Sequence, residues 1–244
     1  MRIELTEVGL FKSVFKNIGL LSDGVDFVFD EEQGLKIAML DKSHVIYYSC
    51  HFMKSFFVDY EYTDDNQGVY SLDSTELGKV LRKCGGDELI MEFYNDSSKC
   101  VIRNGTKTFT LVLLDVEANN SPAPPNLPYV YSVDVPYKYI KESLKDCDMY
   151  GNKVSFNTKG HSLYLTGEGM MGKYSNEYTS DKELETTNST YGIEKIMTIL
   201  GADKISDRII VKGGKDMPLI LEITNVAEDV KLEGLVAPVI GEVE

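Results

Sequence analysis

The segment Glu117-Ala-Asn-Asn-Ser-Pro-Ala-Pro-Pro-Asn-Leu-Pro128 divides the chain almost exactly in half. It holds four of the seven prolines, and the residues that precede them are polar and show no periodicity. Proline favours an extended, semi-rigid backbone and is excluded from central strands. We therefore expect residues 117–128 to form a connecting loop between an N-terminal domain, residues 1–116, and a C-terminal domain, residues 129–244.

Each half of the chain repeats one order of signals: a strand, a helix, about three strands, a second helix and about three further strands. Apolar residues recur at helical spacing in some stretches and alternate with polar residues in others. The expected helices are residues 8–20, 74–84, 137–147 and 191–200. The expected strands are residues 2–6, 25–30, 35–39, 45–51, 88–94, 99–104, 108–116, 130–135, 153–158, 162–166, 172–179, 208–212, 219–224 and 230–235. The repeated order predicts two similarly folded halves.

The composition and net charge limit the classes of partner that the chain can bind. Its 244 residues carry 25 Lys+Arg against 39 Asp+Glu, a formal net charge of −14. This acidity argues at first against a nucleic-acid partner, because cations that contact phosphates dominate affinity for nucleic acids.

The location of the basic residues reverses that argument. The four expected helices hold nine basic and four acidic residues, so the helices carry +5 and the rest of the chain −19. The basic side chains lie mainly opposite the apolar stripe of each helix. They are Lys12, Lys16, Lys79, Arg82, Lys83, Lys138, Lys141, Lys145 and Lys195. A single basic helix face is commonly just a solvated face, but the segregation predicts a cationic stripe that could contact a polyanion without reading its bases.

Other sequence features concern compartment and chemistry. The start Met1–Glu7 has no secretory signal pattern, no stretch is long and apolar enough to span a membrane, and the cysteines are scattered. We expect reduced, interior thiols and a cytoplasmic, nucleoid-associated protein, nuclear if eukaryotic. The three histidines lack metal-ligand spacing, and no nucleotide-binding or nucleophile motif occurs. We therefore expect no catalytic residues, no metal and no cofactor.

Four short segments together carry a family resemblance. In order and spacing they resemble the archaeal and eukaryotic DNA polymerase sliding clamp, proliferating cell nuclear antigen (PCNA), with an archaeal likeness, over essentially the whole chain. They are Gly34-Leu-Lys-Ile-Ala-Met-Leu-Asp-Lys-Ser-His-Val45, Leu114-Asp-Val-Glu117, Asp216-Met-Pro-Leu219 and Leu235-Val-Ala-Pro238.

The resemblance implies an α+β DNA clamp fold. In this fold two similar domains each pack two helices on antiparallel sheets, and three chains form a ring-shaped homotrimer. Residues 108–116 of one subunit would meet residues 172–179 of the next. The ring would encircle double-stranded DNA independently of sequence, with the nine basic side chains facing it, and would perform no chemistry itself.

The resemblance also implies partners for replication and repair. A clamp loader, replication factor C, would load the ring, and DNA polymerase, flap endonuclease and ligase would dock through PCNA-interacting peptide motifs. The implied peptide pocket consists of Leu40, His44, Val45, Tyr47, Leu127, Tyr129, Pro218, Ala237 and Pro238. Without the resemblance, Leu40, Val45 and Ala237 would be read as ordinary core residues. Met39, Gly234 and Val239 depart from the family pattern.

Three alternatives stay open at this level. The chain could be one subunit of a heterotrimeric clamp, or a β-rich protein-interaction scaffold that does not bind DNA. It could also be an enzyme whose catalytic residues are distant in sequence.

Overall fold

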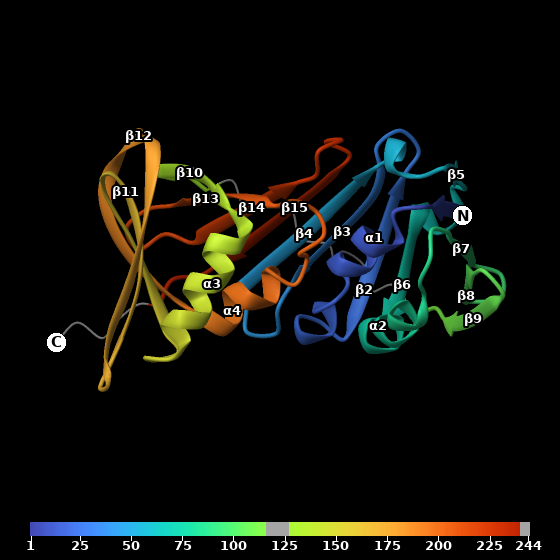
Figure 1. Cartoon of the computed structure of the whole chain (residues 1–244). Coiled ribbons are helices and arrows are strands. Elements are labelled where there is room, and N and C mark those ends of the chain that lie inside the picture. Colours follow the sequence, from blue (N-terminus) through green and yellow to red (C-terminus); the bar gives the residue numbers. More distant parts are fainter. Residues whose placement is uncertain (116–126, 240–244) are drawn as a thin grey trace.

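The computed structural model describes residues 1–115 and 127–239, which form two halves lying side by side (Figure 1). Most of the expected connecting loop, residues 117–126, lies outside the described residues. The helices lie together on the side of the sheets that faces the viewer in Figure 1, and β9 and β12 lie at opposite ends of the chain. The molecule therefore presents a helical face and a sheet face.

The first half follows the expected order with extra short elements. Its elements are β1 (Arg2–Leu5), α1 (Val8–Val14), the 3-10 turn η1 (Ile18–Leu20), β2 (Gly24–Asp30), β3 (Gly34–Leu40), β4 (Ile46–Met53), η2 (Lys54–Phe56), β5 (Asp59–Glu61), η3 (Asp65–Gly68), β6 (Val69–Asp73), α2 (Ser74–Lys83), β7 (Leu89–Tyr94), β8 (Lys99–Asn104) and β9 (Lys107–Val112).

The second half is built on the same plan. Its elements are β10 (Tyr131–Pro136), α3 (Tyr137–Asp148), β11 (Lys153–Gly169), β12 (Gly172–Gly192), α4 (Ile193–Ile199), β13 (Arg208–Gly213), β14 (Leu219–Thr224) and β15 (Val230–Val236). A strand leads into a helix in both halves, and a second helix leads into a three-stranded meander. The predicted repeat of strands and helices is thus present in the structure.

Three antiparallel sheets organise the described residues. Their strand orders are β5-β1-β7-β8-β9, β10-β13-β14-β15-β4-β3-β2-β6 and β11-β12. The eight-stranded sheet crosses from one half to the other because β15 pairs with β4, from Val230 opposite Phe52 to Val236 opposite Ile46. We call this β15–β4 junction the interdomain seam.

The core lies between the helices and the sheets. In α2, Leu77 and Leu81 are buried while Arg82 and Lys83 are exposed, as expected for an amphipathic surface helix. Asp73 caps this helix, its carboxylate accepting a hydrogen bond of 2.8 Å from the Glu76 N–H. All four cysteines are free and buried, which confirms the predicted interior thiols. The apolar stripes thus face the sheets and leave the basic faces outward.

The predicted helix over residues 8–20 is wrong in its length. The helix ends at Val14, and a separate 3-10 turn follows over Ile18–Leu20. Asn17, between them, donates its side-chain amide to the Thr198 carbonyl at 3.1 Å, a contact with the other half of the chain. Helical spacing of apolar residues continues through this break, so periodicity alone could not reveal it.

The strand predictions also need correction. Residues 153–158 and 162–166 belong to one strand, β11, whose register shifts around Gly160. Gly160 has φ +59°, a conformation that glycine adopts easily, so the apparent break is an irregularity within a continuous strand. β12 continues to Gly192, past the predicted end at residue 179, and the expected fourth helix begins at Ile193 rather than residue 191. Residues 180–190 are mostly polar and lack an alternating pattern, so backbone pairing to β11 is what makes them a strand. β5 and β6 were not predicted.

Candidate nucleic-acid interface and partner pocket

The basic side chains of the first half gather around α1 and α2. Lys16 is 55% exposed, and Lys79 is 56% exposed while paired with Glu76 at 2.6 Å. A hollow of about 320 Å³ opens between the two helices, with Lys12, Lys16 and Arg82 on its walls. Lys12 is less free than its neighbours, because its ammonium donates to the Cys84 carbonyl at the end of α2.

The basic side chains of the second half differ among themselves. Lys138 is 83% exposed and lies 3.6 Å from Glu142, whereas Lys145 is exposed and forms no ion pair within residues 1–115 and 127–239. Lys141 is 28% exposed because it reaches across to Asp203. Lys195 is 38% exposed and lies 3.8 Å from the buried Asp41 of the first half, so this lysine faces a carboxylate of the other half of the chain. The structure thus distinguishes well-exposed cations, some of them paired with a carboxylate of the same helix, from less exposed cations that reach a carboxylate of another element.

Two charged residues of this helical face were not predicted. Lys204 is exposed and lines the same hollow as Lys12 and Lys16, and Asp203 lies beside it. Both come from the turn after α4, which a search restricted to helix faces leaves out. The signal that could have found them is the run Ala202-Asp203-Lys204 directly after a helix end.

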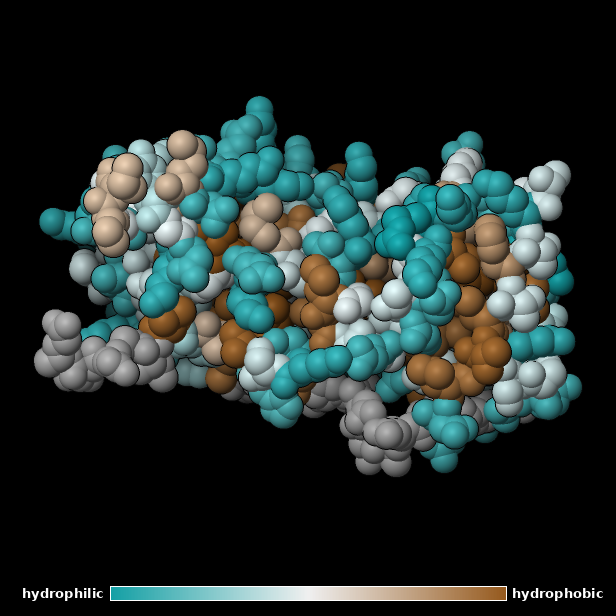
Figure 2. Space-filling view, turned by 90° about the horizontal axis from the view of Figure 1, so that it is seen from below, coloured by the Kyte–Doolittle hydropathy of each residue, from teal (hydrophilic) through white to brown (hydrophobic). Residues whose placement is uncertain are grey.

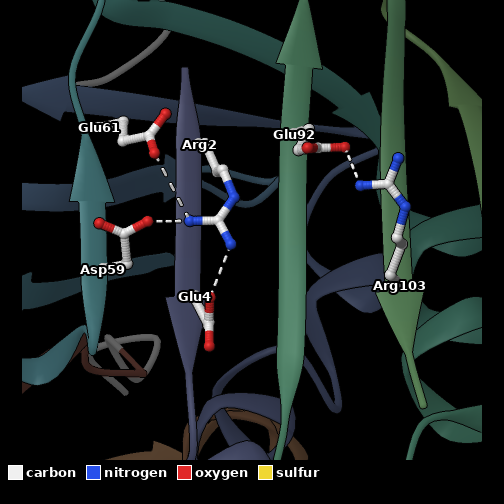
Figure 3. Close-up of polar contacts among 6 residues, drawn as sticks. All are labelled: Arg2, Glu4, Asp59, Glu61, Glu92 and Arg103. Atoms are coloured by element: carbon white, nitrogen blue, oxygen red, sulfur yellow. Dashed lines mark hydrogen bonds and ion pairs between the residues drawn. The ribbon is translucent and has the colours of Figure 1, made fainter.

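The sheet face carries a different distribution of charge. Figure 3 shows Arg2 on β1 between the carboxylates of Glu4, Asp59 and Glu61, while Arg103 on β8 contacts Glu92 on β7. Four carboxylates therefore surround two guanidinium groups on the outer side of the five-stranded sheet. These six residues carry a formal net charge of −2, so this part of the surface favours a polyanion less than the basic helical face does.

Asp41 organises the turn between β3 and β4. Its carboxylate accepts hydrogen bonds from the N–H groups of Val45 at 2.7 Å and Ile46 at 2.6 Å. Burial opposes its ionisation, but these donors and the Ser43 hydroxyl prevail and lower the pKa of Asp41 below its ordinary value. His44 adopts φ +58° within this turn and is exposed. The motif that carried the family resemblance is thus a turn built around one ionised carboxylate.

An apolar cluster lies beside this turn, where the peptide pocket was predicted. Tyr47 packs there with Ala38, Ile220 and Leu235, and Leu127 packs against this cluster. Tyr47 and Leu127 were predicted pocket residues, and the structure brings them together. Ala38, Ile220 and Leu235 were not predicted, because their places follow from strand pairing: β15 and β14 bring Leu235 and Ile220 beside Tyr47.

The other predicted pocket residues differ in their exposure and in their contacts. Leu40 is opposite Tyr47 in the β3–β4 pair and is 41% exposed. Ala237 donates its N–H to the Val45 carbonyl at 2.9 Å, which places Ala237 and Pro238 next to the turn. Val45 packs against the main core, and Pro218 is partly buried. Tyr129 is half-exposed, with the Lys212 ammonium 4.8 Å from its ring centre.

The described residues were compared with the requirements of a metal site and of a membrane-spanning helix. Residues 1–115 and 127–239 hold no group of three or more His, Cys, Asp or Glu side chains suited to a metal ion. No helix in that part of the chain is long and apolar enough to cross a membrane. Figure 2 shows a side on which hydrophilic residues predominate and hydrophobic residues reach the surface in separate patches.

Comparison with known proteins agrees with this architecture. Residues 1–118 match the family model of the proliferating cell nuclear antigen N-terminal domain. The chain is 28% identical over 241 residues to the DNA polymerase sliding clamp of Methanothermobacter thermautotrophicus, with 97% of each chain covered.

Two solved structures show the same fold. The PCNA of A. fulgidus, solved with the C-terminal region of FEN-1 bound, matches with a TM-score of 0.86 and 17% identity over 99% of each chain. The PCNA2–PCNA3 complex of Sulfolobus tokodaii matches with a TM-score of 0.84 and 20% identity, covering 98% of this chain and 99% of that one. The family model, the full-length relative and the clamp architecture agree: residues 1–118 match the PCNA N-terminal domain, and the whole chain is similar in sequence and fold to DNA polymerase sliding clamps of the PCNA family.

Proposed function

We propose that this chain is a processivity factor for DNA polymerase, a clamp that encircles duplex DNA as a ring of three copies. The observation that carries the proposal is the opposition of the two faces. Exposed lysines such as Lys16, Lys79 and Lys138 gather on the helical face, whereas carboxylates surround the arginines of the sheet face. A ring with its helices inward would attract DNA into its channel and repel it from its exterior.

Ring closure is supported by unpaired strand edges at opposite ends of the folded molecule. Among the described strands, β9 pairs only with β8 and β12 only with β11, so each has an open edge. An open edge invites pairing with another chain, and head-to-tail contacts form a ring when the rotation closes. The edge of β9 and the first part of β12, over residues 172–179, are the surfaces that we propose to meet between subunits.

The interdomain seam supports this closure with an internal example. β15 ends the meander of the second half as β9 ends that of the first, and β15 pairs with β4 along seven residues. β4 follows the turn after β3 as the first part of β12 follows the turn after the second part of β11. A β9–β12 pair between chains would repeat the geometry that already joins the two halves.

Sliding places a limit on how strongly the channel holds DNA. Sequence-independent affinity arises from cations that neutralise phosphates, and many equivalent contacts along the backbone allow movement. Mobile, solvated lysines give such contacts, while closure of the ring gives retention. We propose that the clamp performs no reaction itself and acts in the cytoplasm at the nucleoid, or in the nucleus if the source is eukaryotic.

The apolar cluster around Tyr47 supports the tethering of partners. Leu40, opposite Tyr47, is 41% exposed, and Tyr129 is half-exposed, so apolar side chains are available to an aromatic or aliphatic peptide anchor. We propose that DNA polymerase, flap endonuclease and ligase dock here, and that replication factor C loads the ring. Replacing Ala237 and Pro238 together should abolish binding of a PCNA-interacting peptide, and unchanged affinity would show that the pocket is wrongly placed.

Two experiments test the proposed function as a whole. Light scattering of the chain alone should give about three times its mass of 27.4 kDa. A persistent monomer would instead favour a heteromeric clamp, such as the PCNA2–PCNA3 complex represents. On a primed circular template with loader and polymerase, the protein should lengthen the extension products, and unchanged product length would favour a scaffold that does not act on DNA.

A further inference from the structure

Asp203 connects two of the lysines that are predicted to face DNA. Its Oδ2 atom lies 3.1 Å from the Lys141 ammonium on α3 and 3.6 Å from the Lys16 ammonium just after α1. One lysine therefore comes from each half of the chain, and one carboxylate serves both. The carboxylate is 29% exposed, so it is neither sealed from solvent nor fully open to it.

The turn that carries Asp203 is held by both halves. The Asn17 amide of the first half donates to the Thr198 carbonyl, and the Tyr137 hydroxyl donates to the Leu200 carbonyl. The Asp203 N–H itself donates to the Gly201 carbonyl at 2.9 Å. These contacts fix the carboxylate in place, whereas the two lysines reach it with flexible side chains.

The surroundings of Asp203 are otherwise cationic. It is the only carboxylate among the residues that line the hollow between α1, α2 and this turn, where Lys12, Arg82 and Lys204 also lie. Burial opposes ionisation of Asp203, but the hydrogen bond from Lys141 and the charge of Lys16 lower its pKa. The carboxylate is therefore ionised at neutral pH and acts as a fixed counter-charge within a basic face.

We propose that Asp203 is a positioning residue that competes with DNA phosphates for Lys16 and Lys141. The proposal rests on the proposed function, because it requires DNA to pass along the helical face. When a phosphate leaves, the carboxylate forms ion pairs with the two lysines again, so each contact between lysine and phosphate is brief. The intramolecular partner thereby weakens the hold of the ring on DNA and favours sliding.

Asp203→Asn tests the proposal, because it keeps the shape and removes the charge. Freed lysines would release more counterions, so the logarithm of affinity for a short open-ended duplex should fall more steeply with the logarithm of salt concentration, by about 0.9 for each lysine that newly engages a phosphate. Fluorescence anisotropy across a salt series measures this slope. Single-molecule tracking of loaded rings should show a lower diffusion coefficient in the variant.

Asp134→Asn is the matched control. Asp134 pairs with Arg208 at 2.9 Å on β10, where it lies between inward-facing Val133 and Val135 and so points away from the helices. This control removes the same charge from another face of the chain. If both variants change the salt slope equally, the effect is one of net charge and the proposal is overturned.

A variant that lacks both lysines distinguishes competition for the lysines from simple repulsion of DNA by Asp203. When Lys16 and Lys141 are both changed to Gln, Asp203→Asn should no longer steepen the slope. If the slope steepens as before, the carboxylate does not act through these lysines. Asp203→Ser replaces Asp203→Asn if the latter fails to assemble, as judged by mass and melting temperature. Absence of duplex binding by the unchanged protein would instead refute the proposed function, which keeps the two failures distinct.

Discussion

Gly234 is a position where one added methyl group should measurably weaken the chain. It lies in β15 opposite Tyr48 of β4, at the interdomain seam. A Cβ atom there would lie 2.6 Å from Cγ2 and 2.7 Å from Cδ1 of Ile199, which belongs to α4. Ordinary contact between carbon atoms needs about 3.5–4.0 Å, so α4 would have to shift by about 1 Å. Gly234 is thus a requirement of helix packing and not of an unusual backbone angle.

The size of the effect follows from this geometry. Overpacking of a tight core costs about 1–3 kcal/mol, and each kcal/mol lowers the melting temperature of a chain of this length by about 2–4 °C. We therefore expect Gly234→Ala to lower the free energy of unfolding by that amount and the melting temperature by about 2–12 °C. Thermal and urea unfolding at one fixed protein concentration would measure both, because assembly makes the melting temperature depend on concentration.

A double-mutant cycle decides whether the reasoning is right. Ile199→Ala removes the three atoms nearest to the new methyl group, Cγ2, Cδ1 and Cγ1 of Ile199, so the two substitutions together should cost less than the sum of their separate costs, by about 0.5–3 kcal/mol. Strict additivity would refute the packing argument. Gly78→Ala is the control of opposite sign: its Cβ would meet nothing closer than 3.6 Å in α2, and replacement of a helical glycine should stabilise by up to about 1 kcal/mol.

Three further predictions concern the ring, the channel and acid stability. Val112→Asp at the β9 edge should shift the assembled species toward monomer in light scattering, since Val112 is 73% exposed in the single chain and would be buried in the proposed contact between subunits. Val226→Asp, at a turn where the side chain is 98% exposed, should leave the assembly unchanged. Lys138→Gln should reduce the salt slope of duplex binding and Lys195→Gln should leave it unchanged, because Lys195 already faces Asp41. The folded-state pKa of Asp41 lies below its ordinary value of 3.8, so the stability it contributes is present above that pH and is lost as the pH falls below it. Asp41→Asn should therefore lower the melting temperature at pH 7 and flatten its dependence below about pH 4; an unchanged acid profile would show that the turn does not depend on this charge.

The sequence predicted the plan of the fold because local signals determine much of it. The Asp73 cap and the apolar stripe of α2 are both readable from adjacent residues, and the helix bounds agree closely. The end of α1 was not readable, because it depends on Asn17 contacting Thr198 in the other half. The length and register of β12 likewise depend on pairing with β11. That pairing produces no alternating pattern in the polar residues 180–190, so the sequence did not reveal it.

The candidate sites show the same division. The basic helix faces follow from the spacing of the lysines. Among the nine basic residues expected to face DNA, Lys195 is the one that the described structure pairs with a buried carboxylate, Asp41 of the other half. The structure does not test their contact with DNA. Asp203 escaped prediction because its partners are separated from it by 187 and 62 residues. Likewise, Ile220 and Leu235 become pocket residues only when strand order is known.

A clamp must open somewhere, and the two kinds of seam differ in strength. The interdomain seam is one strand pair with seven residue pairs within one chain, and the two halves are also joined by the Lys195–Asp41 pair and by the Asp203 carboxylate between Lys16 and Lys141. The proposed seam between chains has only the six residues of β9 and no covalent connection. Separation at β9 loses fewer contacts and leaves each chain intact. We therefore expect a loader to open the ring between subunits, and a disulfide engineered across β9 and β12 to block loading on circular DNA while threading onto linear duplex continues.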